Sequence, residues 1–426
     1  MNNHTKPELG GMATVQLDRI QEASVNQKAI VTHTPLMENL NLSRRYGARI
    51  WLKREDLQVV RSYKIRGAYN KISNLSAEER KRGIVCASAG NHAQGVAYTC
   101  AKLGIPGCIF MPCPTPKQKI RQVEFFADGK VEIIIKGDSY DDAHAQAVDH
   151  CESTGKVFVP PFDDPMIIEG QATVGLEILA DAQAPIDYLT VPIGGGGLAA
   201  GVGAYFKQLS PHTKIIGVEP SGAPAMKESF NQGKVVCLDT IDKFVDGAAV
   251  KQVGELTFSI CREVLDDLLL VPEGRICTEI LTLYNEDAIV VEPAGVLSVA
   301  VLHDLKDEIR GKNVVCVLSG SNNDITRTEE IKERSLLYEG LKHYFIVRFP
   351  QRAGALREFL AKVLGPTDDI AYFEYSKKNS REMGPAVIGI ELQSRDDFEP
   401  LLKKLEEHSI PYVYLNDKPD LFHFLV

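Results

Sequence analysis

The sequence lacks several patterns that would assign it to a class at once. No apolar run approaches the length of a membrane span, and no apolar segment follows the start as in a signal peptide. The nine cysteines form no C-x-x-C pair, and cysteine and histidine form no metal-ligand cluster. The formal net charge of −9 argues against a basic nucleic-acid surface. We therefore expect a cytoplasmic protein with reduced thiols and without a metal, nucleic-acid or membrane partner.

What is present is typical of a globular protein with more than one domain. The chain has 426 residues, of which 44% are hydrophobic. Strand patterns alternate with helix patterns over the first three quarters of the chain, which favours βαβ units and mostly parallel sheets, an α/β fold. The expected strands cover residues 48–53, 83–88, 105–111, 131–135, 157–159, 188–193, 214–219, 288–291 and 313–318.

One lysine stands directly in front of a helical pattern. Residues 61–68 read Arg-Ser-Tyr-Lys-Ile-Arg-Gly-Ala, and apolar residues then recur at helical spacing. Most lysines are solvated surface charges. Where a loop turns into a helix, however, the amine of Lys64 would be partly desolvated, which lowers its pKa and makes it a nucleophile toward an aldehyde. This stretch alone does not decide between the two interpretations.

A second stretch follows the expected strand 83–88. Ser88-Ala89-Gly90-Asn91-His92 lies where that strand turns into a helix. The first amides of a helix are unpaired and carry the positive end of its dipole, so a carboxylate can dock there. Serine and asparagine are also ordinary helix caps, and the two interpretations have about equal weight. A histidine in such a place is more often structural than catalytic.

A run of glycines connects the expected strand 188–193 to another helix. Residues 194–199 read Gly-Gly-Gly-Gly-Leu-Ala, and four glycines let backbone amides approach an anion, which predicts a phosphate site. The same residues match a dinucleotide fingerprint, and Glu219 stands where a ribose-binding carboxylate would fall. An NAD-dependent oxidoreductase is therefore a competing hypothesis, although it leaves Lys64 and Asn91 without a role.

The last stretch follows the expected strand 313–318, where a serine hydroxyl can face a ring nitrogen or simply belong to a polar turn. Taken together, four stretches resemble the pyridoxal-phosphate enzymes of the tryptophan-synthase β type, and most closely the threonine deaminases. These stretches are Ser62-Tyr63-Lys64, Ser88-Ala89-Gly90-Asn91-His92, Gly194 to Leu198 and Ser319-Gly320-Ser321-Asn322. The resemblance spans roughly residues 20 to 326 and implies a two-lobed catalytic region.

The resemblance implies a role for each stretch. Lys64 would bind pyridoxal 5'-phosphate covalently and then act as the catalytic base. Asn91 would bond the phenolic oxygen of the cofactor, and Ser319 would face its pyridine nitrogen. The cofactor phosphate would lie on Gly194, Gly195, Gly196, Gly197 and Leu198, and the substrate carboxylate on Ser88, Ala89, Gly90, Asn91 and His92.

The reaction implied in this way is the deamination of L-threonine to 2-oxobutanoate and ammonia, the first step of isoleucine biosynthesis. A serine dehydratase or serine racemase of the same family is an alternative. Racemases of the family carry a second serine where this chain has Ala89, which favours deamination. Several serine-processing relatives hold a divalent cation near the phosphate site, and here Ala225 replaces one of its acids, so no divalent metal is expected, while a monovalent cation near Glu219 stays an open alternative.

The pattern changes after residue 323. Residues 343–426 read as strand, helix, strand, strand, helix, strand, which is the ferredoxin-like α+β order, with strands expected at 344–349, 370–376, 386–392 and 412–415. Pro350 and Gly354 follow the first of these strands, as in the ACT-like regulatory modules of biosynthetic threonine deaminases. The resemblance implies feedback inhibition by isoleucine, with valine as a further candidate, and a homo-tetramer. A module that only assembles subunits is the alternative.

These patterns predict the domain boundaries. A catalytic domain is expected at residues 1–326, with a small lobe at about 54–160 inserted in a large lobe. A charged helical linker would follow at 327–342, and the ACT-like domain would cover 343–426.

Overall fold

The chain folds into two units, Met1–Ile325 and Thr326–Val426. The computed structural model describes residues 15–375 and 383–425. The first fourteen residues of the predicted catalytic domain, the last residue of the predicted strand 370–376 and the C-terminal residue therefore lie outside the described residues.

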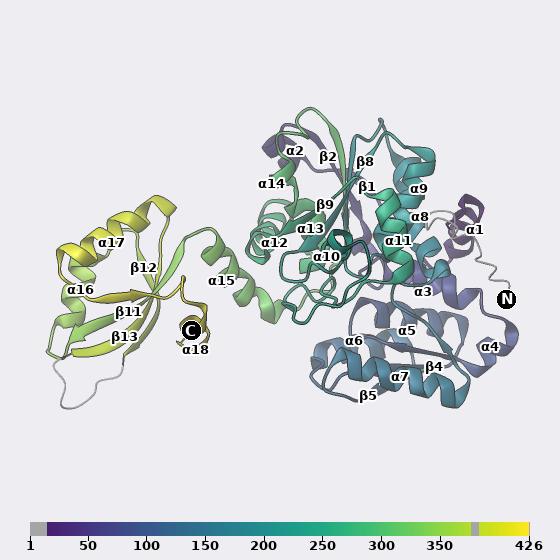
Figure 1. Ribbon diagram of the computed structural model, residues 1–426, viewed down its shortest axis with the longest axis horizontal. Coiled ribbons are helices and arrows are strands. Elements are labelled where there is room, and N and C mark those ends of the chain that lie inside the picture. Colours follow the sequence, from purple (N-terminus) through teal and green to yellow (C-terminus); the bar gives the residue numbers. More distant parts are fainter. Residues whose placement is uncertain (1–14, 376–382, 426) are drawn as a thin grey trace, which may run out of the picture. The chain divides into compact units, whose positions relative to one another are not determined.

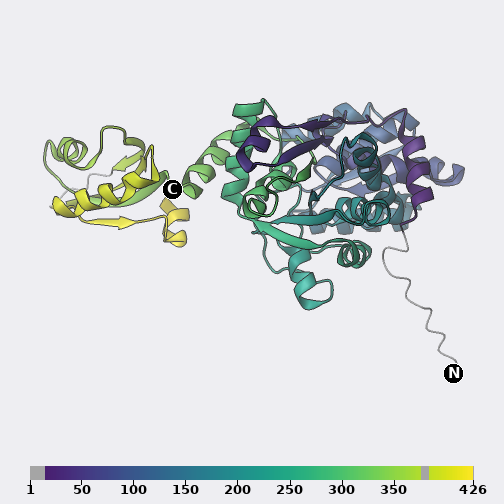
Figure 2. The ribbon, with the colours of Figure 1, turned by 90° about the horizontal axis from the view of Figure 1, so that it is seen from above.

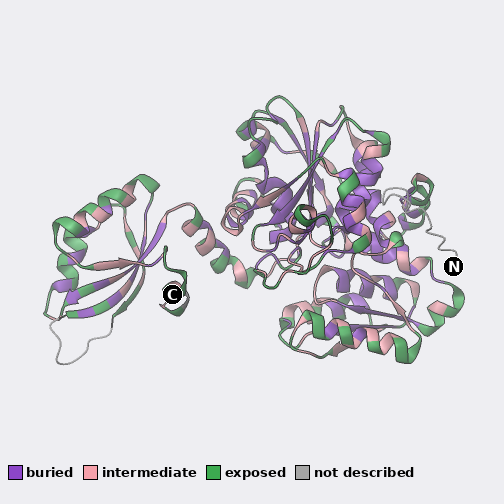
Figure 3. Cartoon of the chain, viewed as in Figure 1, coloured by how far each residue is buried: buried purple, intermediate pink, exposed green. Residues whose placement is uncertain are grey.

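The larger lobe of the first unit is built on a six-stranded sheet with the order β1-β2-β10-β7-β8-β9. Its strands are β1 (Leu36–Glu38), β2 (Arg49–Arg54), β7 (Tyr188–Pro192), β8 (Lys214–Pro220), β9 (Asp267–Val271) and β10 (Asn313–Leu318). Only β1 runs antiparallel to its neighbour. The central strands are mostly apolar and buried, since helices cover both faces of a parallel sheet, and they form the buried centre of this lobe in Figure 3.

The helices of the larger lobe follow the strands in βαβ order, as the sequence predicts. They are α1 (Leu17–Gln27), α2 (Leu40–Tyr46), η2 (Glu55–Leu57), α8 (Pro165–Asp181), α9 (Gly197–Leu209), α10 (Ala225–Gln232), α11 (Glu255–Val264), α12 (Glu273–Asp287), α13 (Pro293–Ala300) and α14 (Leu302–Leu305). The first three turns of α9 are buried on all sides, since α9 packs between α8 and α11. That burial holds the glycine run at the start of α9 in one place.

The smaller lobe is a parallel sheet with the order β5-β4-β3-β6. Its strands are β3 (Ile84–Ala87), β4 (Gly107–Met111), β5 (Val131–Ile135) and β6 (Val157–Phe158), and its helices are α4 (Ala77–Arg82), α5 (Asn91–Leu103), α6 (Lys117–Ala127) and α7 (Tyr140–Thr154). The helix α3 (Lys64–Ser73) packs against α5 of this lobe and α8 of the larger one, and it lies where the lobes meet (Figure 1). Gly170 of α8 permits this approach, because a Cβ there would lie 2.6 Å from the Arg66 carbonyl oxygen.

The second unit has the predicted ferredoxin-like order. Its antiparallel sheet β12-β13-β11-β14 consists of β11 (Lys342–Pro350), β12 (Asp369–Tyr375), β13 (Met383–Glu391) and β14 (Tyr412–Tyr414). The helices are α15 (Thr328–Tyr338), α16 (Ala355–Val363), α17 (Phe398–Glu407) and α18 (Pro419–Leu425). Apolar residues of α16 and α17 share one core with the sheet, and Figure 2 shows α17 lying along the strands.

The structure contradicts one expected strand. Residues 288–291 form none, because Ala288 takes a left-handed φ of 54° as the cap of α12 and the side chains of Ile289 and Val291 are buried as core contacts. A short apolar run fits a buried connection as well as a strand, and the pattern alone does not separate them. The sheet instead has the edge strands β1 and β9, neither of which was expected from the sequence. No helix in the described part of the chain is long and apolar enough to cross a membrane.

Candidate active site

Lys64 is the first residue of α3, at the junction of the two lobes. Its Nζ donates a hydrogen bond to the Pro161 carbonyl oxygen at 3.0 Å and lies 5.4 Å from the centre of the Tyr63 ring. Burial lowers the pKa of Lys64 to about 8, although the nearby Glu292 carboxylate opposes this shift. The amine is therefore partly neutral near physiological pH, as a nucleophile requires.

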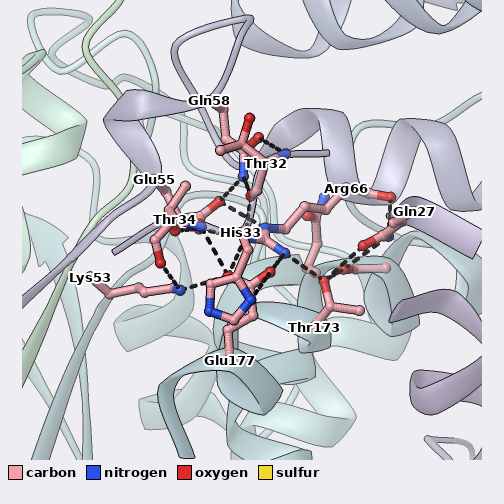
Figure 4. Close-up of polar contacts among 12 residues, drawn as sticks. Gln27, Thr32, His33, Thr34, Lys53, Glu55, Gln58, Arg66, Thr173 and Glu177 are labelled. Carbon is pink, nitrogen blue, oxygen red and sulfur yellow. Dashed lines mark hydrogen bonds and ion pairs between the residues drawn. The ribbon is translucent and has the colours of Figure 1, made fainter. Parts of the chain in front are cut away.

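A buried network of charges fixes the helix that carries Lys64 (Figure 4). Arg66, two residues further along α3, donates to Glu55 at 2.7 and 2.8 Å and to Glu177 of α8 at 2.8 Å. Lys53 of β2 donates to Glu177 at 2.6 Å. These four residues are at most 7% exposed. Two positive and two negative charges thus compensate each other and hold α3 against β2 and α8.

The segment in front of Lys64 is held against the end of β10. The Tyr63 amide donates to the Ser319 carbonyl oxygen at 3.2 Å, and Ser62 forms an isolated antiparallel bridge with Gly320. The Ser319 side chain is 3% exposed, and its hydroxyl donates to the Ala294 carbonyl oxygen at 3.4 Å. Backbone bonds therefore place Lys64 and Ser319, which lie far apart in the sequence, on adjacent segments.

The turn from Ser88 to His92 caps α5. The Gly90 amide donates to the Ser88 hydroxyl at 3.2 Å, and among the described residues no side chain caps the first amides of the helix. Asn91 Nδ2 donates to Glu292 Oε1 at 2.7 Å. The other amide atom, Asn91 Oδ1, is buried and has no hydrogen-bond partner among the described residues. The turn therefore offers free helix amides for an anion and one unused acceptor.

The side chain of His92 has a structural environment. Its Nε2 bonds the Val159 carbonyl oxygen at 2.9 Å, and only 3% of the residue is exposed. Burial, with the positive charge of Lys64 as a smaller cause, lowers the pKa of His92 to about 3. The imidazole is neutral at physiological pH, so only the backbone amide of His92 suits a carboxylate.

The glycine run lies between β7 and α9, with Gly196 at a φ of 93° as the cap of α9. A Cβ on Gly195 would lie 2.1 Å from the Phe162 ring, and one on Gly194 would lie 3.0 Å from Ala248 Cα. Leu198 is buried, and in the part of the chain that the structure describes no side chain caps these helix amides. Since Phe162 adjoins Pro161, the glycine run and the Lys64 amine flank the same short segment. Backbone donors, an open helix end and a reactive amine suit a phosphorylated aldehyde.

Glu219 does not serve as a ribose ligand here. Its carboxylate accepts the amides of Met226 and Lys227 at 2.8 and 2.9 Å, at the start of α10. The residue is 0% exposed, and burial raises its pKa to about 8. The carboxylate that a dinucleotide would need is therefore already bonded within the protein, which leaves the phosphate interpretation of the glycine run.

Comparison with known protein families shows to which family the chain belongs. Residues 28–320 match the model described as "Pyridoxal-phosphate dependent enzyme", and residues 333–425 match "C-terminal regulatory domain of Threonine dehydratase". The chain belongs to the threonine dehydratase family of pyridoxal-phosphate-dependent enzymes. The "L-threonine dehydratase biosynthetic IlvA" of Bacillus subtilis (strain 168) is 57% identical over 421 residues, which cover 99% of this chain and 100% of the relative.

Other relatives of this family agree. The protein of the same name from Staphylococcus aureus (strain COL) is 51% identical, with 97% of this chain and 99% of the relative covered. Among solved structures, threonine deaminase isoform 2 from Solanum lycopersicum is 39% identical at a TM-score of 0.71, with 75% of this chain and 94% of that chain covered. The two-lobed pyridoxal-phosphate fold and the cofactor expected from the sequence are therefore confirmed.

The residues fit the cofactor of this family. Pyridoxal phosphate needs a reactive lysine amine, donors for a phosphate and polar contacts to its ring, and Lys64, the glycine run and Asn91 Oδ1 offer these groups. One residue at this site was missed by the sequence analysis. Glu292 of the larger lobe accepts a hydrogen bond from Asn91 of the smaller lobe. In the sequence, Glu292 stands out only as the residue before Pro293 at the start of a helix.

Proposed function

We propose that this chain deaminates L-threonine to 2-oxobutanoate and ammonia with pyridoxal phosphate, at the first step of isoleucine biosynthesis. The observation that carries the proposal is the amine of Lys64, which burial brings to a pKa of about 8 next to the glycine run. The relatives named as biosynthetic threonine dehydratases match nearly the whole chain, which supports threonine as the substrate.

The side chains divide the work as follows. Pyridoxal phosphate, when bound, supplies the electron sink that stabilises negative charge at the substrate Cα. Lys64 would hold the cofactor, and its amine, once free, would take the proton from Cα. The four glycines and Leu198 would hold the phosphate at the positive end of α9, and Ser319 would be a weak, neutral partner for the ring nitrogen.

The turn from Ser88 to His92 would hold the substrate carboxylate on its helix amides, while Asn91 would contact the cofactor ring. Ala89 has no group that transfers protons, so the face of the substrate opposite Lys64 lacks a second acid. Loss of the β-hydroxyl therefore prevails over return of the proton from the other side, which would invert Cα.

A turnover assay tests this proposal. Purified protein with pyridoxal phosphate is given L-threonine or L-serine, and the 2-oxo acid is measured by coupled reduction. We expect 2-oxobutanoate from threonine, and Lys64→Ala lowers the rate by about 10³-fold or more. Turnover of neither amino acid would contradict the proposal, and serine turned over much faster than threonine would assign a serine dehydratase instead.

We further propose that the second unit binds isoleucine and lowers activity, with valine as a competing effector. Gly354 caps α16 with a φ of 85°, and no side chain within residues 15–375 and 383–425 caps the first amides of this helix, which suit an amino-acid carboxylate. Leu356 and Phe373 are 40% and 39% exposed, so both are accessible to a branched side chain. The proposed catalytic domain covers residues 1–326, the linker 327–342 and the regulatory domain 343–426. The proposed assembly is a homo-tetramer.

A shortened chain tests the regulatory proposal. A chain that ends at Ile325, where the two units divide, should keep deaminase activity and lose inhibition by millimolar isoleucine. Inhibition of the shortened chain to the same degree as the full chain would place the effector site in the first unit. Light scattering of the full chain tests the tetramer.

A further inference from the structure

Glu292 holds a buried carboxylate at the meeting point of the segments that form the site. It is the N-cap residue of α13, yet its side chain accepts no amide of that helix. Instead, Oε1 accepts Asn91 Nδ2 at 2.7 Å, and the residue is 4% exposed. A Cβ on Gly320 would lie 2.5 Å from Oε1, and one on Gly247 would lie 3.4 Å from it. Two glycines thus leave room for this carboxylate next to Ser319.

The ionisable groups around Glu292 include those of the candidate active site. Lys64 lies near enough for the carboxylate to raise its pKa against burial, and burial together with the smaller effect of the same carboxylate raises the pKa of Tyr63. Burial, followed by the negative charge of Asp246, raises the pKa of Glu292 to about 7. Lys119 of α6, which pairs with Asp246, and the Asn91 hydrogen bond lower it. No ion pair of Glu292 occurs in the part of the chain that the structure describes.

The surroundings of Glu292 differ from those of a buried acid that stabilises the fold. Glu177, the buried acid of the network under α3, bonds both Lys53 and Arg66 and is neutralised there. The side chain of Glu292, by contrast, accepts a hydrogen bond from the neutral amide of Asn91, and its charge acts on Lys64. A buried carboxylate without a paired cation is unfavourable for folding. Buried acids of this kind, close to a lysine with a lowered pKa, are typical of functional sites.

We propose that Glu292 is a positioning residue, whose carboxylate orients the Asn91 amide toward the cofactor and holds a negative charge next to Lys64. The inference rests on the proposed function, since it assigns Asn91 to the cofactor ring. With Nδ2 bonded to Glu292, the unused Oδ1 and the second N–H of the amide are fixed in direction. The negative charge favours the protonated form of the Lys64 amine, and so sets the pH at which that amine becomes free to react.

The test measures cofactor uptake by the apoprotein, which does not depend on turnover. Apoprotein of the wild type and of Glu292→Gln is mixed with pyridoxal phosphate at pH 6 to 10, and the rate of uptake is followed by absorbance. Removal of the negative charge should move the midpoint of the pH dependence down by about one unit. Glu279→Gln is the matched control, because Glu279 is also a buried acid but pairs with Arg45. Its midpoint should equal that of the wild type.

A second measurement separates orientation from charge. The equilibrium affinity for pyridoxal phosphate is compared in Asn91→Ala, Glu292→Gln and the double variant. Because Glu292 acts through Asn91, the double variant should lose no more affinity than Asn91→Ala alone. Glu292→Asp keeps the charge on a shorter side chain, so it should retain the wild-type midpoint but bind pyridoxal phosphate several-fold more weakly. If Glu292→Gln does not fold, this variant separates the orienting role of Glu292 from the effect of its charge.

The outcomes distinguish this inference from the proposed function. If wild-type apoprotein takes up no pyridoxal phosphate, the proposed function and the inference both fail. If the wild type takes it up but Glu292→Gln keeps the wild-type midpoint, or if the affinity losses simply add, only the role of Glu292 is overturned. A lowered midpoint with non-additive losses supports it, since a residue that only packs would move neither quantity.

Discussion

Cofactor uptake by the wild-type apoprotein should report the ionisation of Lys64 directly. An amine attacks an aldehyde only in its neutral form, and burial brings the pKa of Lys64 from the ordinary 10.5 to about 8. At pH 7, about one molecule in 11 is then neutral, against roughly one in 3,000 for an ordinary lysine. At pH 7, the neutral, reactive fraction of Lys64 should therefore be up to about 300 times that of an ordinary lysine.

The assay is a stopped-flow mixing of apoprotein with pyridoxal phosphate between pH 6 and 10. The rate should rise close to tenfold per pH unit at the acid end and level off above about pH 9. Pyridoxal phosphate itself titrates in this range, so each rate is divided by that of a model lysine amine at the same pH. The reasoning is refuted if the protein's rate keeps rising to pH 10 in parallel with the model amine. Lys64→Ala provides the baseline.

Three further predictions concern the glycine run, the buried charge network and Ala89. Gly195→Ala should weaken pyridoxal phosphate binding by about tenfold or more, measured by fluorescence titration, because the new methyl group meets the Phe162 ring. Glu177→Gln should lower the free energy of unfolding by about 3–5 kcal/mol in urea titrations, since it leaves Arg66 buried without full compensation. The wild type should form no D-threonine or D-serine at a rate near that of 2-oxo acid formation, whereas Ala89→Ser should gain measurable racemisation on a chiral column.

The elements around the site were predictable where a local pattern determines them. The strand before each site turn and the helix after it follow from apolar runs and from helix periodicity, and the parallel sheets follow from their alternation. The ferredoxin-like order of the second unit is confirmed for the same reason. The strand expected at 288–291 was wrong, because its apolar residues pack as a connection after the left-handed Ala288.

What the sequence does not show is which distant residues meet. Nothing local indicates that Arg66 would pair with Glu177, more than a hundred residues away, or that Asn91 would bond Glu292. Such pairs depend on how two lobes close on each other, and their residue types are ordinary. The roles of Lys64, Asn91, Ser319 and the glycine run came from a family resemblance, and they stay predictions for this chain.

The most direct test of the account is to locate the bound cofactor. Holoprotein is reduced with borohydride, digested and mapped by mass spectrometry for the peptide that carries the pyridoxyl group. The account predicts a single labelled site at Lys64, with visible absorption lost on reduction and no label in Lys64→Ala. A label on another lysine, or none while the protein binds NAD, would contradict it.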